Sequence, residues 1–251
     1  MSIAEFERAF TASDPAYDGR FVTAVRTTGI FCRPICTARK PFARNVTFLP
    51  DAAAARAAGY RACLRCQPDN PTPIHLRAVE TPIGSLTLGA TADAVVLADF
   101  SDRAMMPAQL AAVRRRIGPT TFSSTPLLDE LEQQLRAFLA GERRTFDLPV
   151  DLPGSPFQES VWAELRRIPY GETITYRELA ARVGLPAASR AVGRANGSNR
   201  LAIVVPCHRV VAAGGGLGGY GGGLPAKRWL LELERAVAQG SGSADGHAHV
   251  A

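Results

Sequence analysis

Apolar positions recur along this chain with periods that indicate a few short strands and a series of amphipathic helices. Alternating or continuous apolar stretches predict strands at 75–81, 85–90 and 94–100, the first two separated by the turn residues Pro82 and Gly84. The clearest helical period lies within 126–140. Its apolar face consists of Leu127, Leu128, Leu131, Leu135 and Phe138. Further helices are predicted at about 105–117, 156–167, 176–183, 187–195 and 225–238.

Residues that are typical of helix ends define the limits of the predicted helices in the last third of the chain. Ser155 is a natural N-cap, Pro156 suits the first helical position, and Gln158 completes a capping box. The next two predicted helices are short and are joined through Gly184-Leu185-Pro186, which is the spacing of a helix-turn-helix. An apolar run at 201–205 and a glycine-dense loop follow them.

A proline-rich stretch at 67–73 divides the chain and reads as a linker. It separates a first segment with four clustered cysteines from the strands and helices described above. We therefore predict an α+β chain. Its expected parts are domains at 1–70, 75–152 and 153–238, and a disordered tail at 239–251 that is rich in Gly, Ser, Ala and His.

The composition is that of an ordinary globular protein, with 46% hydrophobic and 21% charged residues. The chain has no run of ~20 apolar residues, which is what a helix needs to span a bilayer. Its N-terminus has early acidic residues and lacks the apolar run of a secretory signal. We therefore expect the protein to act in the cytoplasm, where cysteines stay reduced.

Charge is spread unevenly along the chain. Residues 1–70 hold ten Lys and Arg against six Asp and Glu, residues 71–159 hold eight against eleven, and residues 160–235 hold eleven against five. Basic blocks suit phosphate backbones, because each neutralised phosphate releases counterions. They also suit a solvated protein surface, so charge alone leaves DNA binding open.

Four of the five cysteines form two close pairs, Cys32 with Cys36 and Cys63 with Cys66, and this spacing predicts a tetrahedral zinc site. A segment this small buries little apolar surface, so bound metal would supply much of its folding energy. Zinc-bound sulfur also stays a thiolate at neutral pH, and a thiolate is a nucleophile. The residues alone leave open whether the zinc is structural only or also serves a reactive cysteine.

The first segment resembles the N-terminal zinc module of the bacterial Ada proteins over about residues 3–70. The resemblance rests on Thr28-Gly29-Ile30-Phe31-Cys32-Arg33-Pro34, Asn45-Val46-Thr47-Phe48, Ala58-Gly59-Tyr60-Arg61 and Cys63-Leu64-Arg65-Cys66-Gln67-Pro68-Asp69. It implies one zinc ion held by Cys32, Cys36, Cys63 and Cys66. It also implies that Cys32 accepts a methyl group from a methylphosphotriester in DNA. The DNA contacts it implies are Thr28, Arg39, Arg61 and Arg65.

The fifth cysteine, Cys207, stands alone within Pro206-Cys207-His208-Arg209-Val210. An isolated cysteine is most often a small buried hydrophobe. Here the adjacent His208 and Arg209 favour a thiolate, and Pro206 restricts the backbone before the cysteine. A Cys–His pair also serves cysteine hydrolases, so the pair by itself does not decide the chemistry.

A wider pattern resembles the O6-alkylguanine-DNA alkyltransferases over about residues 75–238. It comprises Tyr176-Arg177-Glu178-Leu179-Ala180, Ser189-Arg190-Ala191-Val192-Gly193, Asn199, Val204-Val205-Pro206-Cys207-His208-Arg209-Val210, 218–223 and 227–234. The resemblance implies a ribonuclease-H-like subdomain followed by a helix-turn-helix subdomain with the active cysteine. It further implies single-turnover transfer of an alkyl group from O6-alkylguanine, and from O4-alkylthymine, in DNA onto Cys207.

This resemblance assigns roles that agree with general chemistry. Cys207 is the nucleophile, His208 withdraws its proton through water, and Glu234 orients His208. Tyr176 donates to the departing base, and Asn199 holds the turn before the cysteine. Because the lesion must leave the base stack, the resemblance also implies DNA contacts and a pocket for the flipped nucleotide. These residues are Arg190 and Arg194 on the recognition helix, and Tyr176, Val205, Pro206 and Tyr220 around the pocket.

The sequence departs from full-length Ada proteins at one point. Those proteins carry an AraC-type DNA-binding region between the zinc module and the alkyltransferase, whereas here residues 71–73 lead directly into the strand that begins at His75. Three function classes therefore stand side by side: a repair protein, a methylation-responsive transcriptional regulator and a cysteine hydrolase. We expect a monomer that binds double-stranded DNA containing alkylated guanine or a methylphosphotriester, and no membrane partner.

Overall fold

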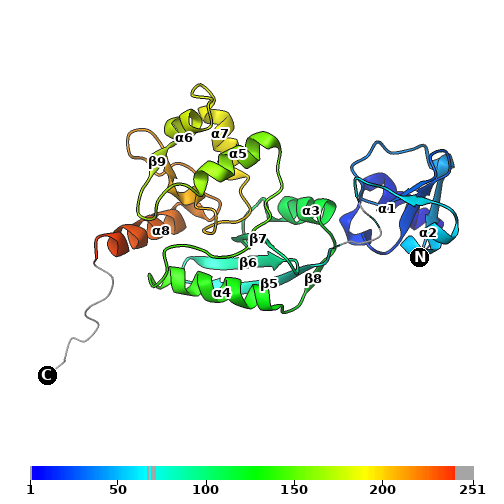
Figure 1. Ribbon diagram of the computed structural model, residues 1–251, viewed down its shortest axis with the longest axis horizontal. Coiled ribbons are helices and arrows are strands. Elements are labelled where there is room, and N and C mark those ends of the chain that lie inside the picture. Colours follow the sequence, from blue (N-terminus) through cyan, green and yellow to red (C-terminus); the bar gives the residue numbers. More distant parts are fainter. Residues whose placement is uncertain (1, 67, 69–71, 241–251) are drawn as a thin grey trace. The chain divides into compact units, whose positions relative to one another are not determined.

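The computed structural model describes residues 2–66, 68 and 72–240 (Figure 1). Contacts divide the chain into two compact units, Met1–Ile74 with Pro107–Thr121, and His75–Met106 with Phe122–Ala251. The chain mixes helices with small sheets, so the predicted α+β class is confirmed. The predicted tail lies outside the described residues after Gly240, and so does most of the predicted linker.

A four-stranded sheet with the order β3-β1-β2-β4 organises the first unit. β1 (Val22–Val25) pairs antiparallel with β2 (Ile30–Cys32) and β3 (Val46–Leu49), and β4 (Arg61–Ala62) runs parallel to β2. The helical segments of this part are α1 (Ile3–Ala12), η1 (Pro15–Tyr17), η2 (Ala43–Asn45) and α2 (Ala52–Ala57).

The pairing of β2 with β4 brings distant cysteines together. Cys32 is the last residue of β2, and Cys63 directly follows β4. The Cys63 amide donates to the carbonyl of Phe31 at 2.9 Å, which holds the two strand ends side by side. The tight turn before β2 depends on Gly29, whose φ of +64° is readily adopted only by glycine.

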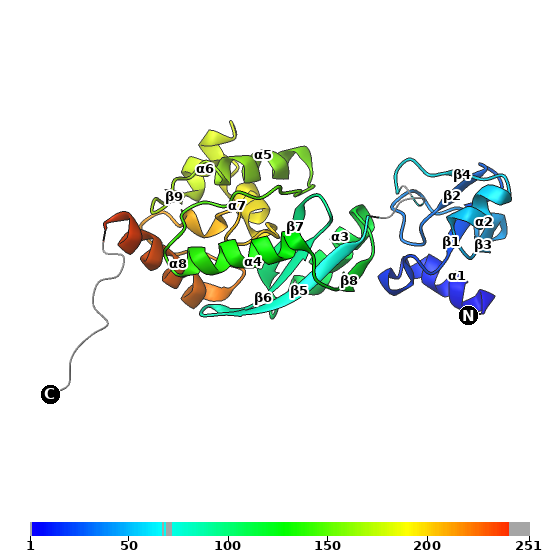
Figure 2. The same cartoon turned by 60° about the horizontal axis from the view of Figure 1, so that its bottom comes forward.

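The second unit begins with an antiparallel meander in a sheet with the order β7-β6-β5-β8. The strands of this sheet are β5 (Ile74–Thr81), β6 (Gly84–Ala90), β7 (Val95–Phe100) and β8 (Thr120–Phe122). Helix α3 (Met106–Arg116) leads into β8, and contacts group Pro107–Thr121 with the first unit. The three predicted strands are confirmed to within one residue at each end, whereas β8 was not predicted. Helix α4 (Pro126–Leu139) packs on β6 and β7 (Figure 2).

The remaining helices of the second unit follow the predicted order. They are α5 (Pro156–Leu165), α6 (Tyr176–Arg182), α7 (Ser189–Gly197) and α8 (Gly223–Ala238), together with β9 (Ile174–Thr175), the 3-10 turn η3 (Cys207–Arg209) and β10 (Val210–Val211). The capping box between Ser155 and Gln158 is present at the start of α5. Helices α6 and α7 pack against each other, so the predicted pair of short helices is confirmed.

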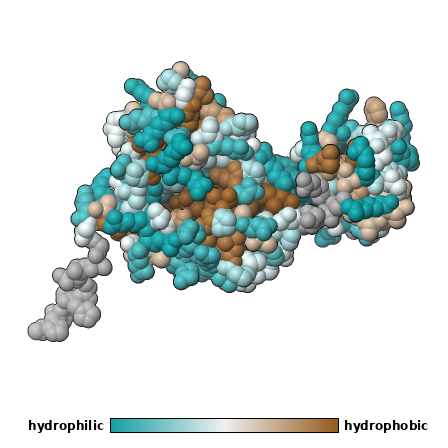
Figure 3. All heavy atoms as spheres, in the orientation of Figure 1, coloured by the Kyte–Doolittle hydropathy of each residue, from teal (hydrophilic) through white to brown (hydrophobic). Residues whose placement is uncertain are grey.

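One hydrophobic core runs through the second unit, from β6, β7 and α4 to α5, α6, α7 and α8. The subdomains predicted on either side of residue 152 therefore share a core. Strand β7 also touches the segment before Cys207, because the amide of Ala98 donates to the carbonyl of Arg200 at 2.8 Å. In the view of Figure 3, hydrophobic residues gather between α4 and α5 and hydrophilic residues surround them.

Candidate active site

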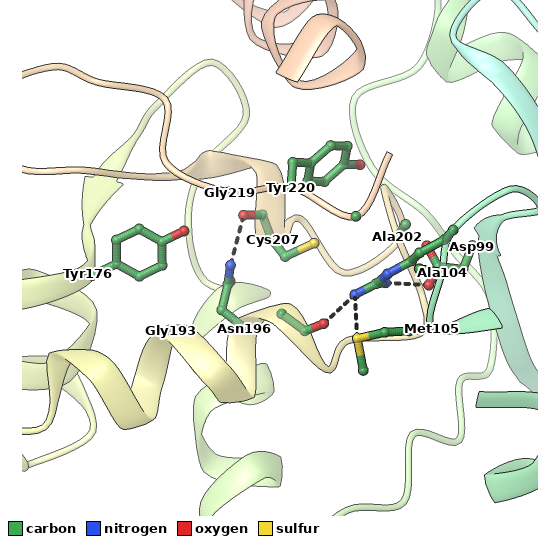
Figure 4. A pocket seen from close by; sticks show the side chains of 13 residues that line it. Asp99, Ala104, Met105, Tyr176, Gly193, Asn196, Ala202, Cys207, Gly219 and Tyr220 are labelled. Atoms are coloured by element: carbon green, nitrogen blue, oxygen red, sulfur yellow. Dashed lines mark hydrogen bonds and ion pairs between the residues drawn. The ribbon is translucent and has the colours of Figure 1, made fainter. Parts of the chain in front are cut away.

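A cavity of about 410 Å³ lies where β7, α6, α7 and the segments around Cys207 and Tyr220 meet (Figure 4). This volume falls within the range of pockets that hold small ligands. Its lining includes Asp99, Met105, Tyr176, Asn196, Cys207 and Tyr220. A planar base or a similar group therefore has room beside the only cysteine of this unit.

Cys207 is the first residue of η3 and follows directly on Pro206. Its side chain is buried but contributes to the cavity wall. In Figure 4 the sulfur is directed away from Tyr176 and toward the side formed by Ala202 and Ala104. Burial raises the pKa of this thiol, so the resting side chain is protonated and needs a base before it can act as a nucleophile.

A strained turn precedes the cysteine. Ile203 has a φ of 71°, in the left-handed region that β-branched residues rarely enter. The side chain of Asn199 braces this turn, because its Oδ1 accepts from the amide of Leu201 at 3.0 Å and its Nδ2 donates to the carbonyl of Val205 at 2.9 Å. The backbone direction at Cys207 is therefore fixed from both sides of the turn.

Behind the cysteine, His208 and Glu234 are both fully buried and lie in contact. His208 Nε2 is 2.8 Å from Glu234 Oε1. The same carboxylate accepts from the Arg209 guanidinium at 2.9 Å and from the amide of Gly171 at 3.0 Å. A carboxylate with these donors stays ionised and acts only as an acceptor, so it selects the tautomer of His208 with the proton on Nε2.

The pKa shifts agree with this assignment. Burial on its own raises the pKa of Glu234, but the hydrogen bond from His208 and the charge of Arg209 outweigh it and bring the pKa to about 2. Burial lowers the pKa of His208 more than Glu234 raises it, so the ring is neutral at pH 7. Its Nδ1 has no hydrogen-bond partner among the described residues and carries a free lone pair.

Two tyrosines face the cavity from different elements. Tyr176 opens α6, and Tyr220 lies in the glycine-rich loop before α8, with its ring 5.6 Å from that of Phe100. Burial raises the pKa of both hydroxyl groups, so both remain protonated donors. The Tyr220 hydroxyl is buried without a partner in the described part of the chain.

In the first unit, the sulfur atoms of Cys32, Cys36, Cys63 and Cys66 all lie within 4.8 Å of one another. Tetrahedral zinc with Zn–S bonds of ~2.3 Å places its sulfurs roughly 3.8 Å apart, so the cluster fits one zinc ion. The amide of Arg33 donates to Cys66 Sγ at 3.4 Å, as expected beside a thiolate. Cys32 is half-buried, whereas the other three cysteines are buried.

Sequence comparisons match both units to known families. Residues 156–236 match the DNA-binding domain of 6-O-methylguanine DNA methyltransferase, and residues 5–69 match the metal-binding domain of Ada. The methylated-DNA–protein-cysteine methyltransferase of Mycobacterium bovis is 44% identical over 165 residues, which is 66% of this chain and 94% of that protein. The chain belongs to the methylated-DNA–protein-cysteine methyltransferase family.

A second similar protein and a similar crystal structure support this family membership. The bifunctional transcriptional activator and DNA repair enzyme Ada of Escherichia coli is 31% identical, over 89% of this chain and 94% of that protein. The crystal structure of Mycobacterium tuberculosis OGT in complex with DNA superposes with a TM-score of 0.57 at 42% identity, over 65% of this chain and 94% of that one. The resemblances drawn from the sequence motifs are thereby confirmed.

Within this methyltransferase fold, the structure brings Cys207, Tyr176 and Tyr220 to one cavity and places His208 and Glu234 behind it. Val205 and Pro206 lie outside this cavity and line two separate hollows, Val205 beside Trp162 and Pro206 beside Arg209. The residues assigned to DNA contacts are all exposed. They are Arg190 and Arg194 on α7, and Thr28, Arg39, Arg61 and Arg65 in the first unit.

Arg209 was expected to favour the Cys207 thiolate, but its guanidinium pairs with Glu234 instead, and two charged residues at the cavity, Asp99 and Arg103, were not predicted from the sequence. Arg209 shares Glu234 with His208, and Asp99 and Arg103 form a salt bridge at the cavity wall. One sequence signal existed for Asp99, because it is a lone acid inside the continuous apolar run 95–100. Arg103 lies in a polar turn and gives no such signal.

Among the described residues, every helix is too short or too polar to cross a membrane.

Proposed function

We propose that this chain repairs alkylated double-stranded DNA by moving the alkyl group of O6-alkylguanine, and of O4-alkylthymine, onto Cys207. The observation that carries the proposal is the neutral His208 behind a cysteine that lines a cavity. Its Nε2 is held by Glu234, and its Nδ1 is without a partner among the described residues. This arrangement supplies a nucleophile, a base and an orienting carboxylate.

The reaction moves two protons and one alkyl group. The Cys207 thiol passes its proton through a water molecule to Nδ1 of His208, and the imidazolium is stabilised by Glu234. The thiolate attacks the alkyl carbon, a C–S bond forms, and the C–O6 bond breaks with its electron pair going to the base. The Tyr176 hydroxyl then donates a proton to the base, which leaves as unmodified guanine.

The product is a thioether, which has no leaving group to return the sulfur. Each chain therefore acts once and is consumed. One lesion and one chain suffice for this reaction, so we propose that the protein acts as a monomer, with the cytoplasm as its site of action.

DNA binding follows from the same geometry. An alkylated base inside a duplex lies beyond the reach of a buried thiol, so the nucleotide must be turned out of the stack into the cavity. Arg190 and Arg194 project from the exposed side of α7, next to the cavity residues Gly193 and Asn196. We propose that Arg190 fills the space left by the flipped base and that Arg194 binds a phosphate.

A specific observation favours a second acceptor, Cys32. It is the half-buried member of the four-cysteine cluster, so a DNA backbone has better access to it than to the other three. Bound zinc keeps all four sulfurs as thiolates. We propose that Cys32 takes the methyl group of a methylphosphotriester, with the exposed Arg39, Arg61 and Arg65 attracting the neighbouring phosphates.

Peptide mass analysis after incubation with two methylated duplexes tests both acceptors. A duplex with O6-methylguanine is expected to add one methyl group to the Cys207 peptide. A duplex with a methylphosphotriester is expected to add one to the Cys32 peptide. Cys207→Ala should lose the first gain and keep the second. Repair of methylguanine by Cys207→Ala, or repeated repair by the wild type without a gain in mass, refutes the main proposal.

The two rival classes have their own signatures. A transcriptional regulator would protect one promoter sequence from cleavage only after Cys32 is methylated. A cysteine hydrolase would turn over acyl substrates many times per chain.

A further inference from the structure

The end of β7 and the turn that follows it form a side of the cavity to which the proposed chemistry gives no role. Asp99, Arg103 and Met105 line this side. The Asp99 side chain is fully buried, and that of Arg103 is only 10% exposed. A charged pair this deeply buried beside a reactive thiol needs an explanation, because desolvating two charges is costly.

The Arg103 guanidinium is held by a buried carboxylate and by two backbone carbonyls. It pairs with Asp99, and its Nη1 donates to the carbonyl of Asn199 at 3.1 Å. Its Nη2 donates to the carbonyl of Gly197 at the end of α7 and lies 3.9 Å from Met105 Sδ (Figure 4). These bonds hold the planar group in one orientation across the gap between β7 and α7.

The opposite flank of the guanidinium lies directly on a glycine. A Cβ at Gly221 would lie 2.7 Å from Arg103 Cζ, and a Cβ at Gly222 would lie 2.3 Å from the ring of Phe100. Both distances are shorter than real Cβ contacts, so the glycine loop closes onto β7 only because these two positions lack side chains. Arg103 thus forms a continuous wall with the loop that carries Tyr220.

Arg103 and the loop that carries Tyr220 enclose the part of the cavity toward which the Cys207 sulfur is directed. The Cys207 sulfur is directed toward Ala202 and Ala104, away from Tyr176 (Figure 4). Ala104 adjoins Arg103 in the chain, and both line the cavity. An alkyl group larger than methyl needs room on this side, and an apolar group gains nothing from contact with a guanidinium whose donors are already engaged.

We infer that Arg103 is a specificity-determining residue, which limits the size of the alkyl group that reaches Cys207. The inference rests on the proposed transfer to Cys207. Arg103 stays in place against a bulky group, because swinging it out would break its ion pair with the fully buried Asp99 and its hydrogen bonds to the carbonyls of Asn199 and Gly197. Removing the pair together opens the wall without creating an unpaired charge.

The test compares single-turnover rates for O6-methylguanine and O6-benzylguanine in the same duplex. The variant Asp99→Asn/Arg103→Ala is expected to raise the benzyl-to-methyl rate ratio about tenfold or more, the range that pocket size commonly controls. Arg103→Lys keeps the charge with a slimmer end group and should raise the ratio less. Arg77→Ala, which removes another arginine of this unit that is paired with Asp129, is the control and should leave the ratio unchanged.

Each outcome decides one claim. An unchanged ratio in the double variant, or a parallel fall of both rates, overturns the role of Arg103. If the double variant does not fold, the ratio in Arg103→Lys decides instead, and no rise there overturns the role. A wild type that gains no methyl group on Cys207 refutes the proposed function itself, which is a separate result.

Discussion

Glu234→Gln is the substitution that tests most directly how the buried Glu234 carboxylate controls His208. In the structure the Glu234 carboxylate receives donors from three directions, namely His208, Arg209 and the amide of Gly171. Glutamine has nearly the same shape but carries no charge. The variant therefore leaves the Arg209 guanidinium buried without its counter-charge. It also gives His208 a neighbour that can donate as well as accept, so the tautomer of His208 is no longer selected.

The size of the effect follows from the pKa. The Glu234 pKa falls from 4.5 to about 2. One pH unit corresponds to about 1.4 kcal/mol, so the folded state gains about 3 kcal/mol from this carboxylate at neutral pH. Because the folded-state pKa is the lower one, this contribution is complete above pH 4.5 and is lost as the pH falls toward 2.

Urea unfolding at pH 7, followed by tryptophan fluorescence, measures the loss. Glu234→Gln is expected to lower the free energy of unfolding by about 3 kcal/mol. Glu232→Gln is the matched control, since Glu232 lies two residues earlier on α8 and is exposed. Single-turnover transfer to Cys207 should slow by about 10²-fold or more, because His208 loses its fixed tautomer.

Two results would refute this reasoning. A loss of stability below ~1 kcal/mol, no larger than that of many surface substitutions, would mean that Glu234 is not a fully paired buried charge. A transfer rate equal to that of the control would mean that His208 works without its orienting partner.

Three further predictions follow from the site. The rate of transfer to Cys207 should be independent of pH above the ordinary histidine pKa of 6.5 and should fall only below it, because burial lowers the pKa of His208 and keeps the base neutral. A rate profile from pH 5 to 8 checks this prediction, and a loss of rate above pH 6.5 contradicts it. Zinc chelation should unfold residues 2–66, seen by circular dichroism, while transfer to Cys207 continues. Tyr176→Phe should slow transfer about 10²-fold with little change in melting temperature.

Much of the secondary structure was predictable from local sequence. The strands β5, β6 and β7 and helix α4 appear within one residue of the predicted bounds. The capping box at Ser155 fixed the start of α5. These signals act between residues at most four apart in the chain, where backbone geometry alone decides the contact. By contrast, the two-residue strands β9 and β10 pair across 36 positions and left no local pattern.

The residues of the two sites could be predicted only where several of them lie close together in one sequence motif. The paired cysteines indicated the zinc ligands from residue type and spacing. The Cys–His pair at 207–208 left several chemistries open, and Cys207 was assigned as the nucleophile through family resemblance. Glu234 was assigned through family resemblance, and nothing in its amphipathic helix distinguishes it from a surface charge. Its burial beside His208 became visible only in the folded chain.

The sequence by itself determined that this chain has a four-thiol zinc module, a helix-turn-helix and a cysteine followed by a histidine, since each depends on residues that are close together in the chain. The tertiary structure decided which side chains complete the cavity and which surround His208 behind it. Arg103 meets the Asn199 carbonyl 96 positions away, and Arg209 meets Glu234 across 25. Contacts over such separations depend on how strands and helices pack into a common core, and packing is a property of the whole fold rather than of any segment.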